Sequence, residues 1–273
     1  MKQQRIFFNS SLPRAGSTLL SNIVGHHPDF YVSPTSALID LVLGSRIGYN
    51  DSRETAYTDT ETWKKGFINF NRYGLAGFMN AVSDKPCYLD KSRMWAAYYD
   101  LLSMIVPNPR VVLMVRDLRA IYASMEKKFR ENPDVDAKIM NNVEMTGITT
   151  DQRVTHWSKT HPVGYSVIKL NELILQKLDK NVLFFRYEDF CQAPDEHMKR
   201  LYEFFEVDYF QHDWNNIQQL TSENDEAHGI FGDHKIRQKL ERKPDDFQEI
   251  LGNYTCNRIV SENRWFYDYF RYN

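Results

Sequence analysis

The chain has 273 residues, of which 42% are hydrophobic and 26% are charged, and its formal net charge at pH 7 is −2. This length suits one α/β domain with insertions better than two independent domains, so we expect a single domain over residues 1–273. A net charge so near zero excludes the global basic field of a nucleic-acid-binding protein, and any anion site must be local.

The cysteines and the hydropathy pattern argue against a disulfide-rich secreted protein and against a membrane-spanning protein. Cys87, Cys191 and Cys256 are odd in number and show no paired spacing, so a reduced cytoplasmic protein is expected. No apolar run suggests a signal peptide or reaches the ~18 residues of a membrane span. His156 and His161 lie five residues apart, which does not match the spacing of a helical metal pair, and no metal site is predicted.

Short apolar runs alternate with helical patterns along the chain. In chain order these predict strand 6–8, helix 18–24, helix 36–43, helix 61–78, strand 87–90, helix 94–106, strand 111–115, helix 118–130, helix 151–180, strand 182–185, helix 194–205 and helix 254–270. Such alternation is typical of an α/β fold in which a central parallel sheet is flanked by helices. Ligands of such sheets bind at the carboxyl ends of the strands, so the loops after each strand are the places to search.

Several of these elements carry more specific expectations. Ser33, Pro34 and Thr35 indicate the start of a helix. Trp63, Phe67 and Phe70 recur at helical spacing, which predicts a buried aromatic stripe. The sequence predicts a break of the helical pattern at Pro162.

Two further segments are read from their composition. The polar, asparagine-rich residues 131–150 predict a long loop or lid. The apolar run VVLMV at 111–115, with proline before it and charge after it, is typical of a central strand that is buried on both faces.

The first loop after a strand has the composition of a phosphate cradle. Gly16 permits a tight turn, and the residues after it begin a helix whose free N–H groups favour an anion. Ser17 and Thr18 add hydroxyl donors, and Arg14 adds a forked cation. The alternative is an ordinary capped helix after a turn.

This loop is not a Walker A motif, because that motif requires G-x-x-x-x-G-K-[ST]. With Gly16 as the second glycine, Ser11 stands at the first glycine and Ser17 at the lysine. The lysine that reaches the β- and γ-phosphates is missing, which disfavours ATP or GTP as the ligand. A P-loop kinase with a degenerate Walker loop stays open as an alternative.

The loop after the strand at 111–115 presents a second set of polar residues. Arg116 follows the strand directly, and Ser124 lies eight residues further on, about two helical turns away. Asp117 is either a displaced metal ligand or an acid at a helix N-terminus, which the helix dipole favours without any further role.

Together these two loops resemble the sulfotransferases that use 3′-phosphoadenosine 5′-phosphosulfate (PAPS). The run P-R-A-G-S-T-L at 13–19 resembles their 5′-phosphosulfate loop, and Arg116 with Ser124 resembles their 3′-phosphate motif. Lys91 falls where these enzymes carry a lysine, and Tyr187 lies in a segment similar to their Y-E-[DE] element. The resemblance covers roughly residues 5–205 and implies a sulfotransferase fold related to the P-loop nucleotide kinases.

The resemblance also implies roles for individual residues. The loop that would hold the 5′-phosphosulfate consists of Arg14, Ala15, Gly16, Ser17, Thr18 and Leu19. Arg116 and Ser124 would hold the 3′-phosphate, which ATP lacks, and Lys91 would neutralise charge on the bridging oxygen as the sulfur leaves. Arg14 and Lys91 can then suffice without a metal. A basic C-terminal segment closes over the nucleotide in related enzymes, and Lys235 and Arg237 are the candidates for it here.

The general base that the acceptor hydroxyl needs does not carry over from the family. Arg93 stands where cytosolic sulfotransferases have histidine, and residues 33–36 contain no acid where tyrosylprotein sulfotransferases have glutamate. Arg93 suits an anionic acceptor or the sulfuryl oxygens. Asp40 and Asp90 are the candidate bases, and a capping or surface acid is the alternative for each.

The expected acceptor is a hydroxyl or amine of a small molecule, carbohydrate or lipid. A protein tyrosine is less favoured, because no secretory signal is recognised. A protein that keeps the fold and binds the nucleotide without catalysis is a further alternative, since no base is located.

Overall fold

Five parallel strands form the centre of the fold. The computed structural model describes residues 4–57, 59–131, 145, 147–225, 233–242 and 244–272. The strands are β1 (Arg5–Asn9), β2 (Phe30–Thr35), β3 (Cys87–Lys91), β4 (Arg110–Val115) and β5 (Val182–Arg186). Their order in the sheet is β2-β3-β1-β4-β5, and every neighbouring pair is parallel. The predicted fold class, a central parallel sheet flanked by helices, is confirmed.

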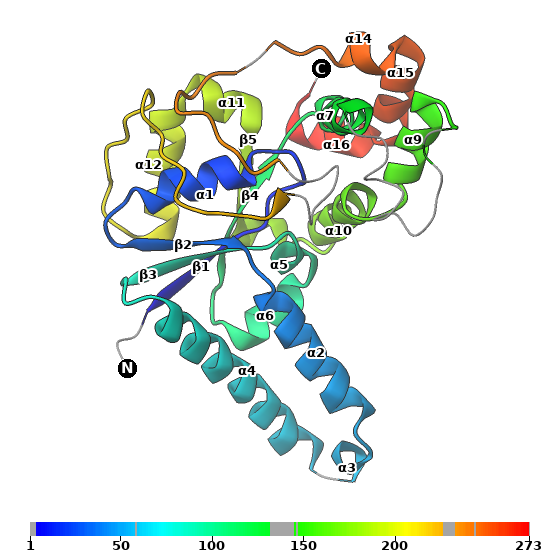
Figure 1. The fold of residues 1–273 in the computed structure, drawn as a ribbon. Coiled ribbons are helices and arrows are strands. Elements are labelled where there is room, and N and C mark those ends of the chain that lie inside the picture. The colour runs from blue at the N-terminus through cyan, green and yellow to red at the C-terminus, as the bar shows by residue number, and fades with distance from the viewer. Residues whose placement is uncertain are drawn as a thin grey trace.

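Helices cover both faces of this sheet (Figure 1). Phe7 and Phe8 are neighbours on β1 and point to opposite faces, as side chains of a strand do. The ring of Phe7 stacks on Phe205 with centroids 4.2 Å apart, and the ring of Phe8 packs on Trp95 at 4.7 Å. One face is therefore covered by α12, which contains Phe205, and the other by α5, which contains Trp95.

The helices follow the predicted order but divide more often than the patterns suggest. They are α1 (Ser17–Gly25), α2 (Leu38–Asp51), α3 (Arg53–Ala56), α4 (Thr60–Val82), α5 (Met94–Ala97), α6 (Tyr99–Ile105), α7 (Leu118–Glu131), α9 (Thr150–Trp157), α10 (Val163–Leu175), the 3-10 turn η1 (Asp179–Asn181), α11 (Tyr187–Gln192), α12 (Pro194–Phe205), α14 (Phe247–Leu251), α15 (Asn253–Glu262) and α16 (Arg264–Phe270). The break expected at Pro162 is present between α9 and α10. Most of the predicted lid, residues 132–144 and 146, lies outside the described residues.

The helix start predicted from Ser33, Pro34 and Thr35 is wrong, because these residues end strand β2. A proline cannot donate a hydrogen bond to a neighbouring strand, but β2 lies at the edge of the sheet, where a proline is tolerated. The pairing register with β3 also shifts between Val32 and Thr35. Helix α2 then begins at Leu38.

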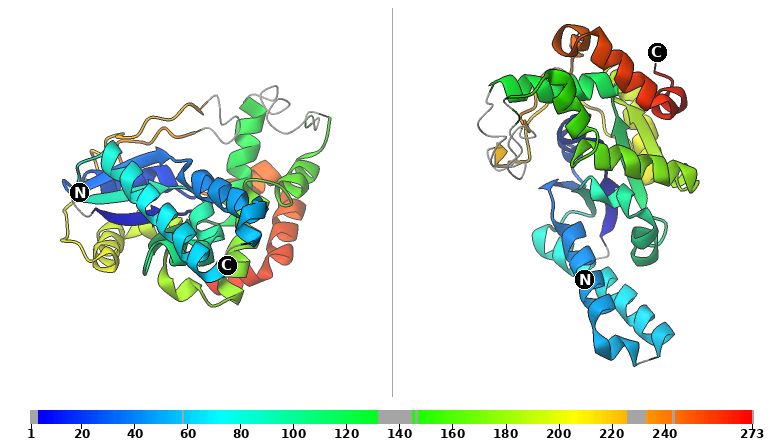
Figure 2. Two further views of the ribbon diagram at one scale, coloured as in Figure 1. Left: turned by 90° about the horizontal axis from the view of Figure 1, so that it is seen from below. Right: turned by 90° about the vertical axis from the view of Figure 1, so that its right-hand side faces the viewer.

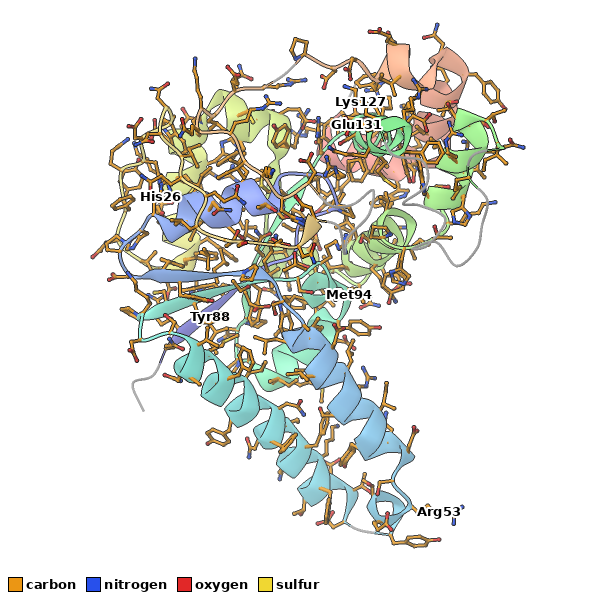
Figure 3. The ribbon with its side chains drawn as sticks, viewed as in Figure 1. His26, Arg53, Tyr88, Met94, Lys127 and Glu131 are labelled. Carbon is orange, nitrogen blue, oxygen red and sulfur yellow. The ribbon has the colours of Figure 1, made fainter. Side chains whose placement is uncertain are left out.

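Helices α2 and α4 form an arm that projects from the body of the protein. Arg53 marks its far tip in Figure 3, and the right-hand view of Figure 2 shows the arm directed away from the sheet. The buried aromatic stripe predicted for α4 is wrong: Trp63 is 50% exposed, Phe70 is 69% exposed, and Phe67 is half-buried. A helical period indicates one apolar face but not what covers it, and α4 buries only its C-terminal half, through Leu75 and Met79.

Within the described ranges, no helix combines the length and the apolar character that crossing a membrane requires.

Candidate active site

A cleft of about 460 Å³ opens at the carboxyl edge of the sheet. Its size falls in the range of small-molecule sites, ~300–1,000 Å³. The walls come from the loop after β1, the end of β3, the end of β4 with helix α7, Tyr187 after β5, and residues 233–237, 239–241 and 244–247. Lys127 and Glu131, labelled in Figure 3, line the α7 side of this cleft.

The loop after β1 forms one end of the cleft. Helix α1 begins at Ser17, and Gly16 before it has a φ of 94°, a left-handed conformation that favours glycine. A Cβ at Gly16 would lie 3.0 Å from the Tyr187 ring. The tight turn at Gly16 leads directly into α1. The free N–H groups at the start of this helix suit an anion.

The residues predicted for this loop are not all exposed to the cleft. Those that line it are Arg14, Gly16, Ser17, Thr18 and Leu19. Ala15 is fully buried and does not line the cleft.

Arg116 and Ser124 lie directly beside this loop. Arg14 Nε donates to Ser124 Oγ at 3.0 Å, although the two residues are 110 positions apart in the chain. Arg116 Nη1 donates to the carbonyl oxygen of Arg14 at 3.1 Å, and its guanidinium lies 4.9 Å from the centre of the Tyr187 ring. The structure thus brings both sequence motifs and Tyr187 together in one cleft.

Lys91 stands at the end of β3, next to the start of α1. Its Nζ donates to Thr18 Oγ1 at 3.0 Å and forms an ion pair with Glu223. Lys91 is only 4% exposed, and burial lowers its pKa although Glu223 acts in the opposite direction. Arg93, two residues on, also lines the cleft, and burial likewise lowers its pKa.

Glu223 is a candidate that the sequence analysis missed. Burial would raise its pKa, but the charge of Lys91 and hydrogen bonds from Lys91 and Thr35 outweigh burial and hold the pKa below its usual value. Thr35 Oγ1 donates to Glu223 Oε2 at 2.5 Å, and His234 Nε2 lies 3.1 Å from the same oxygen. His234 Nδ1 in turn lies 2.6 Å from Asp225 Oδ1. No sequence pattern around Glu223 predicts its place beside the cleft. Contacts with Thr35 and Lys91, which are distant in the chain, hold it there.

The segment that follows contributes further charges to the cleft. Asp233 Oδ2 forms an ion pair with Arg14 Nη2 at 2.6 Å. Lys235 and Arg237, predicted to close over a nucleotide, both line the cleft and are exposed. Acidic and basic side chains of the C-terminal part therefore line the cleft, and Asp233 pairs with Arg14 of the first loop.

The two predicted general bases do not lie in the cleft. Asp90 is fully buried and accepts hydrogen bonds from Ser33 at 3.3 Å, Ser36 at 2.9 Å and Trp95 at 2.7 Å. Burial raises its pKa to about 6 even against these hydrogen bonds. Asp40 is exposed on α2 and is likewise absent from the cleft lining. Asp90 thus joins β3 to the start of the arm, and Asp40 is an acid in the first turn of its helix.

Asp117 has a structural explanation as well. Its carboxylate accepts from Arg119 Nη2 at 2.6 Å and from Tyr267 Oη at 3.0 Å. These contacts join the start of α7 to α16. Among the described residues, no group of three or more His, Cys, Asp or Glu side chains is arranged to hold a metal ion.

Comparison with known proteins identifies relatives over most of the chain. The sequence profile of the sulfotransferase family matches residues 7–211. A putative protein-tyrosine sulfotransferase of Caenorhabditis briggsae is 20% identical over 254 residues, which are 88% of this chain and 79% of that protein. Carbohydrate sulfotransferase 4 of Mus musculus is 31% identical over 117 residues, which are 42% of this chain and 30% of the mouse protein. The solved sulfotransferase domain from the curacin biosynthetic pathway has a similar fold, with a TM-score of 0.54 and 15% identity over 96% of this chain and 98% of that one.

Proposed function

Because the chain belongs to the sulfotransferase family, we propose that it transfers a sulfuryl group from PAPS to a hydroxyl or amine of an acceptor. The family match covers residues 7–211, which include Arg14, Lys91, Arg116 and Ser124. The donor PAPS supplies the activated sulfuryl group. The side chains of the cleft bind and orient this donor and stabilise the charge that develops on it.

One observation carries the proposal: the hydrogen bond of 3.0 Å between Arg14 Nε and Ser124 Oγ. PAPS has a phosphate on either side of its ribose, so its site needs two adjoining anion subsites. The loop at Arg14 suits the 5′-phosphosulfate, and Arg116 with Ser124 suits the 3′-phosphate. A nucleotide without a 3′-phosphate leaves the second subsite without its anion.

Lys91 would stabilise the leaving group. Its ammonium lies 3.0 Å from Thr18 Oγ1, at the start of the helix whose N–H groups favour the phosphate. When the bond between sulfur and the bridging oxygen breaks, negative charge builds on that oxygen. A buried ammonium that reaches this oxygen stabilises such charge.

Lys235 and Arg237 complete the donor site from the open side. Both are exposed and line the cleft opposite the first loop. We assign them to the phosphates of the bound nucleotide, where each adds a cation that solvent and salt partly screen. Their contribution to affinity is therefore smaller than that of Arg14 or Arg116 and falls as ionic strength rises.

The proposed acceptor is a small molecule, carbohydrate or lipid with a hydroxyl group. The mouse relative is named a carbohydrate sulfotransferase, whereas the nematode relative is named a protein-tyrosine sulfotransferase. Arg93 beside Lys91 suits an acceptor that carries a negative charge. Acceptor screens should thus contain sugars and lipids as well as phenols.

The proposal is tested by ligand-induced stabilisation followed by product detection. We expect adenosine 3′,5′-bisphosphate to raise the Tm of the protein far more than 5′-AMP or ATP with Mg²⁺ at equal concentration. With PAPS and an acceptor panel, mass spectrometry should then detect a sulfated product without added metal. Preferential stabilisation by ATP with Mg²⁺ contradicts the proposal and favours the kinase. Tight binding of the bisphosphate without turnover on any acceptor favours a non-catalytic protein.

A further inference from the structure

A buried carboxylate lies immediately behind Lys91. The side chain of Glu223 is 3% exposed, and its Oε1 forms the ion pair with Lys91. Oε2 is held from two sides, by the hydroxyl of Thr35 at 2.5 Å and by His234 Nε2 at 3.1 Å. Asp225 fixes the other ring nitrogen of His234 at 2.6 Å. This arrangement orients the carboxylate with Oε1 toward Lys91.

Three groups that contact Glu223 belong to the wall of the cleft. Thr35, Lys91 and His234 line it, so Glu223 is one side chain away from the cleft. Asp90 differs in this respect, because Ser33, Ser36 and Trp95, which bond to it, do not line the cleft. Lys91 therefore separates Glu223 Oε1 from the cleft, whereas the residues that bond to Asp90 lie away from it.

The donor itself supplies a reason for Lys91 to move. PAPS carries several negative charges, and its bridging oxygen competes with Glu223 for the ammonium of Lys91. A Lys91 side chain that turns from Glu223 toward this oxygen uncovers Oε1 beside the sulfuryl group. The exchange also removes the cation that holds the pKa of Glu223 low, so the carboxylate becomes more basic once the donor is bound.

We propose that Glu223 is the general base of the reaction and that His234, fixed by Asp225, is its positioning residue. This inference rests on the proposed sulfotransferase function. The O–H bond of the acceptor breaks and its proton passes to Glu223 Oε1, while the acceptor oxygen forms a new bond to sulfur. The bond between sulfur and the bridging oxygen breaks, and its electron pair leaves with adenosine 3′,5′-bisphosphate beside Lys91. The proton on Glu223 is released to solvent after the products leave.

The deciding experiment compares two probe acceptors in the Glu223→Gln variant. At pH 8 phenol keeps its proton and needs a base, whereas 4-nitrophenol is largely ionised and does not. General base catalysis is typically worth about 10²–10⁴-fold. We expect kcat with phenol to fall by about this factor and kcat with 4-nitrophenol to fall by less than about 10-fold. Release of adenosine 3′,5′-bisphosphate from PAPS reports both rates, with water alone as the baseline.

Two further variants separate this role from structural ones. Glu206→Gln removes another ion-paired glutamate, the partner of Arg110 outside the cleft, and should change neither rate. His234→Gln should show the same dependence on the acceptor as Glu223→Gln with a smaller loss. A merely structural His234 affects both phenols alike. The affinity of Glu223→Gln for the bisphosphate, measured by calorimetry, should equal or exceed that of the wild type, because Lys91 loses a competing anion.

Each other result contradicts a defined part of the argument. Equal losses with both phenols mean that Glu223 only positions Lys91, and undiminished rates mean that Glu223 has no part in the reaction. In both cases the donor site stands. A wild-type protein that binds the bisphosphate but transfers sulfuryl to no acceptor of the panel and not to water contradicts the base and the proposed reaction together. A wild-type protein that does not bind the bisphosphate contradicts the donor instead.

Discussion

Replacing Arg116 by alanine tests the second phosphate subsite directly. Arg116 stands at the end of β4, where its Nη1 bonds to the Arg14 carbonyl at 3.1 Å and its guanidinium stacks on Tyr187. A hydrogen bond to a charged group contributes about 1.5–3 kcal/mol. A loss of about 2.7 kcal/mol corresponds to a bisphosphate affinity about 100-fold lower.

The effect of Arg116→Ala is large enough for a melting experiment. At a bisphosphate concentration of 100 Kd, the wild type gains about 2.7 kcal/mol, and a 100-fold weaker variant gains only about 0.4 kcal/mol. For a chain of this size each kcal/mol shifts Tm by about 2–4 °C. The bisphosphate should thus raise the wild-type Tm by about 5–10 °C and that of the variant by about 1 °C.

Two comparisons show whether the loss comes from the 3′-phosphate. The much smaller stabilisation by 5′-AMP should be the same in both proteins, because this nucleotide lacks the phosphate that we assign to Arg116. Arg264→Ala removes an exposed arginine of α16, and its bisphosphate shift should match the wild type. An unchanged bisphosphate shift in Arg116→Ala, or an equal loss with both nucleotides, refutes the assignment of Arg116 to the 3′-phosphate.

Three further substitutions test the surroundings of the site. Gly16→Ala places a Cβ 3.0 Å from the Tyr187 ring at a left-handed φ. This strain should lower the free energy of unfolding by about 1–2 kcal/mol, which is measured as a lower denaturant midpoint. The bisphosphate should also bind more weakly. Asp90 has a folded-state pKa raised to about 6, so the folded protein binds more protons than the unfolded chain between about pH 4 and 6, and stability falls as pH rises through this window. In Asp90→Asn this fall, about 3 kcal/mol for the single group, should vanish from a series of urea titrations across that pH range. Glu126→Ala leaves the buried Arg153 without the carboxylate now 2.6 Å away, and calorimetry should show a loss of about 3–5 kcal/mol; a loss below about 1 kcal/mol would mean that solvent reaches Arg153.

Several features around the cleft follow from local sequence. Gly16 at a tight turn, the apolar run of β4 and Arg116 directly after it are features of a few consecutive residues. Once the strands are recognised as parallel, their carboxyl ends must meet at one edge. For this reason Arg14, Lys91 and Tyr187, each near the end of a strand, lie at the same edge of the sheet and line one cleft.

Other features could not be predicted from the sequence, because they depend on which distant parts of the chain pack against each segment. Pro34 looks like a helix start until β2 is placed at the sheet edge, where its missing N–H costs no hydrogen bond. Trp63 has helical spacing, but the body of the protein does not cover its face of α4. Glu223 reaches the cleft through its contact with Lys91, which lies 132 residues earlier in the chain. No local pattern encodes such a contact.

The pairing of Arg14 and Lys91 with acids far along the chain has a consequence for synthesis on the ribosome. Asp233 follows Arg14 by 219 positions in the chain, and Glu223 follows Lys91 by 132 positions. During translation, strands β1 to β4 emerge well before these acids, so a nascent chain holds Lys91 without its carboxylate. A buried ammonium without a counter-charge is unfavourable, and the growing chain therefore keeps this edge of the sheet open to water. The cleft is then among the last parts of the molecule to take its final form, after the sheet that supports it.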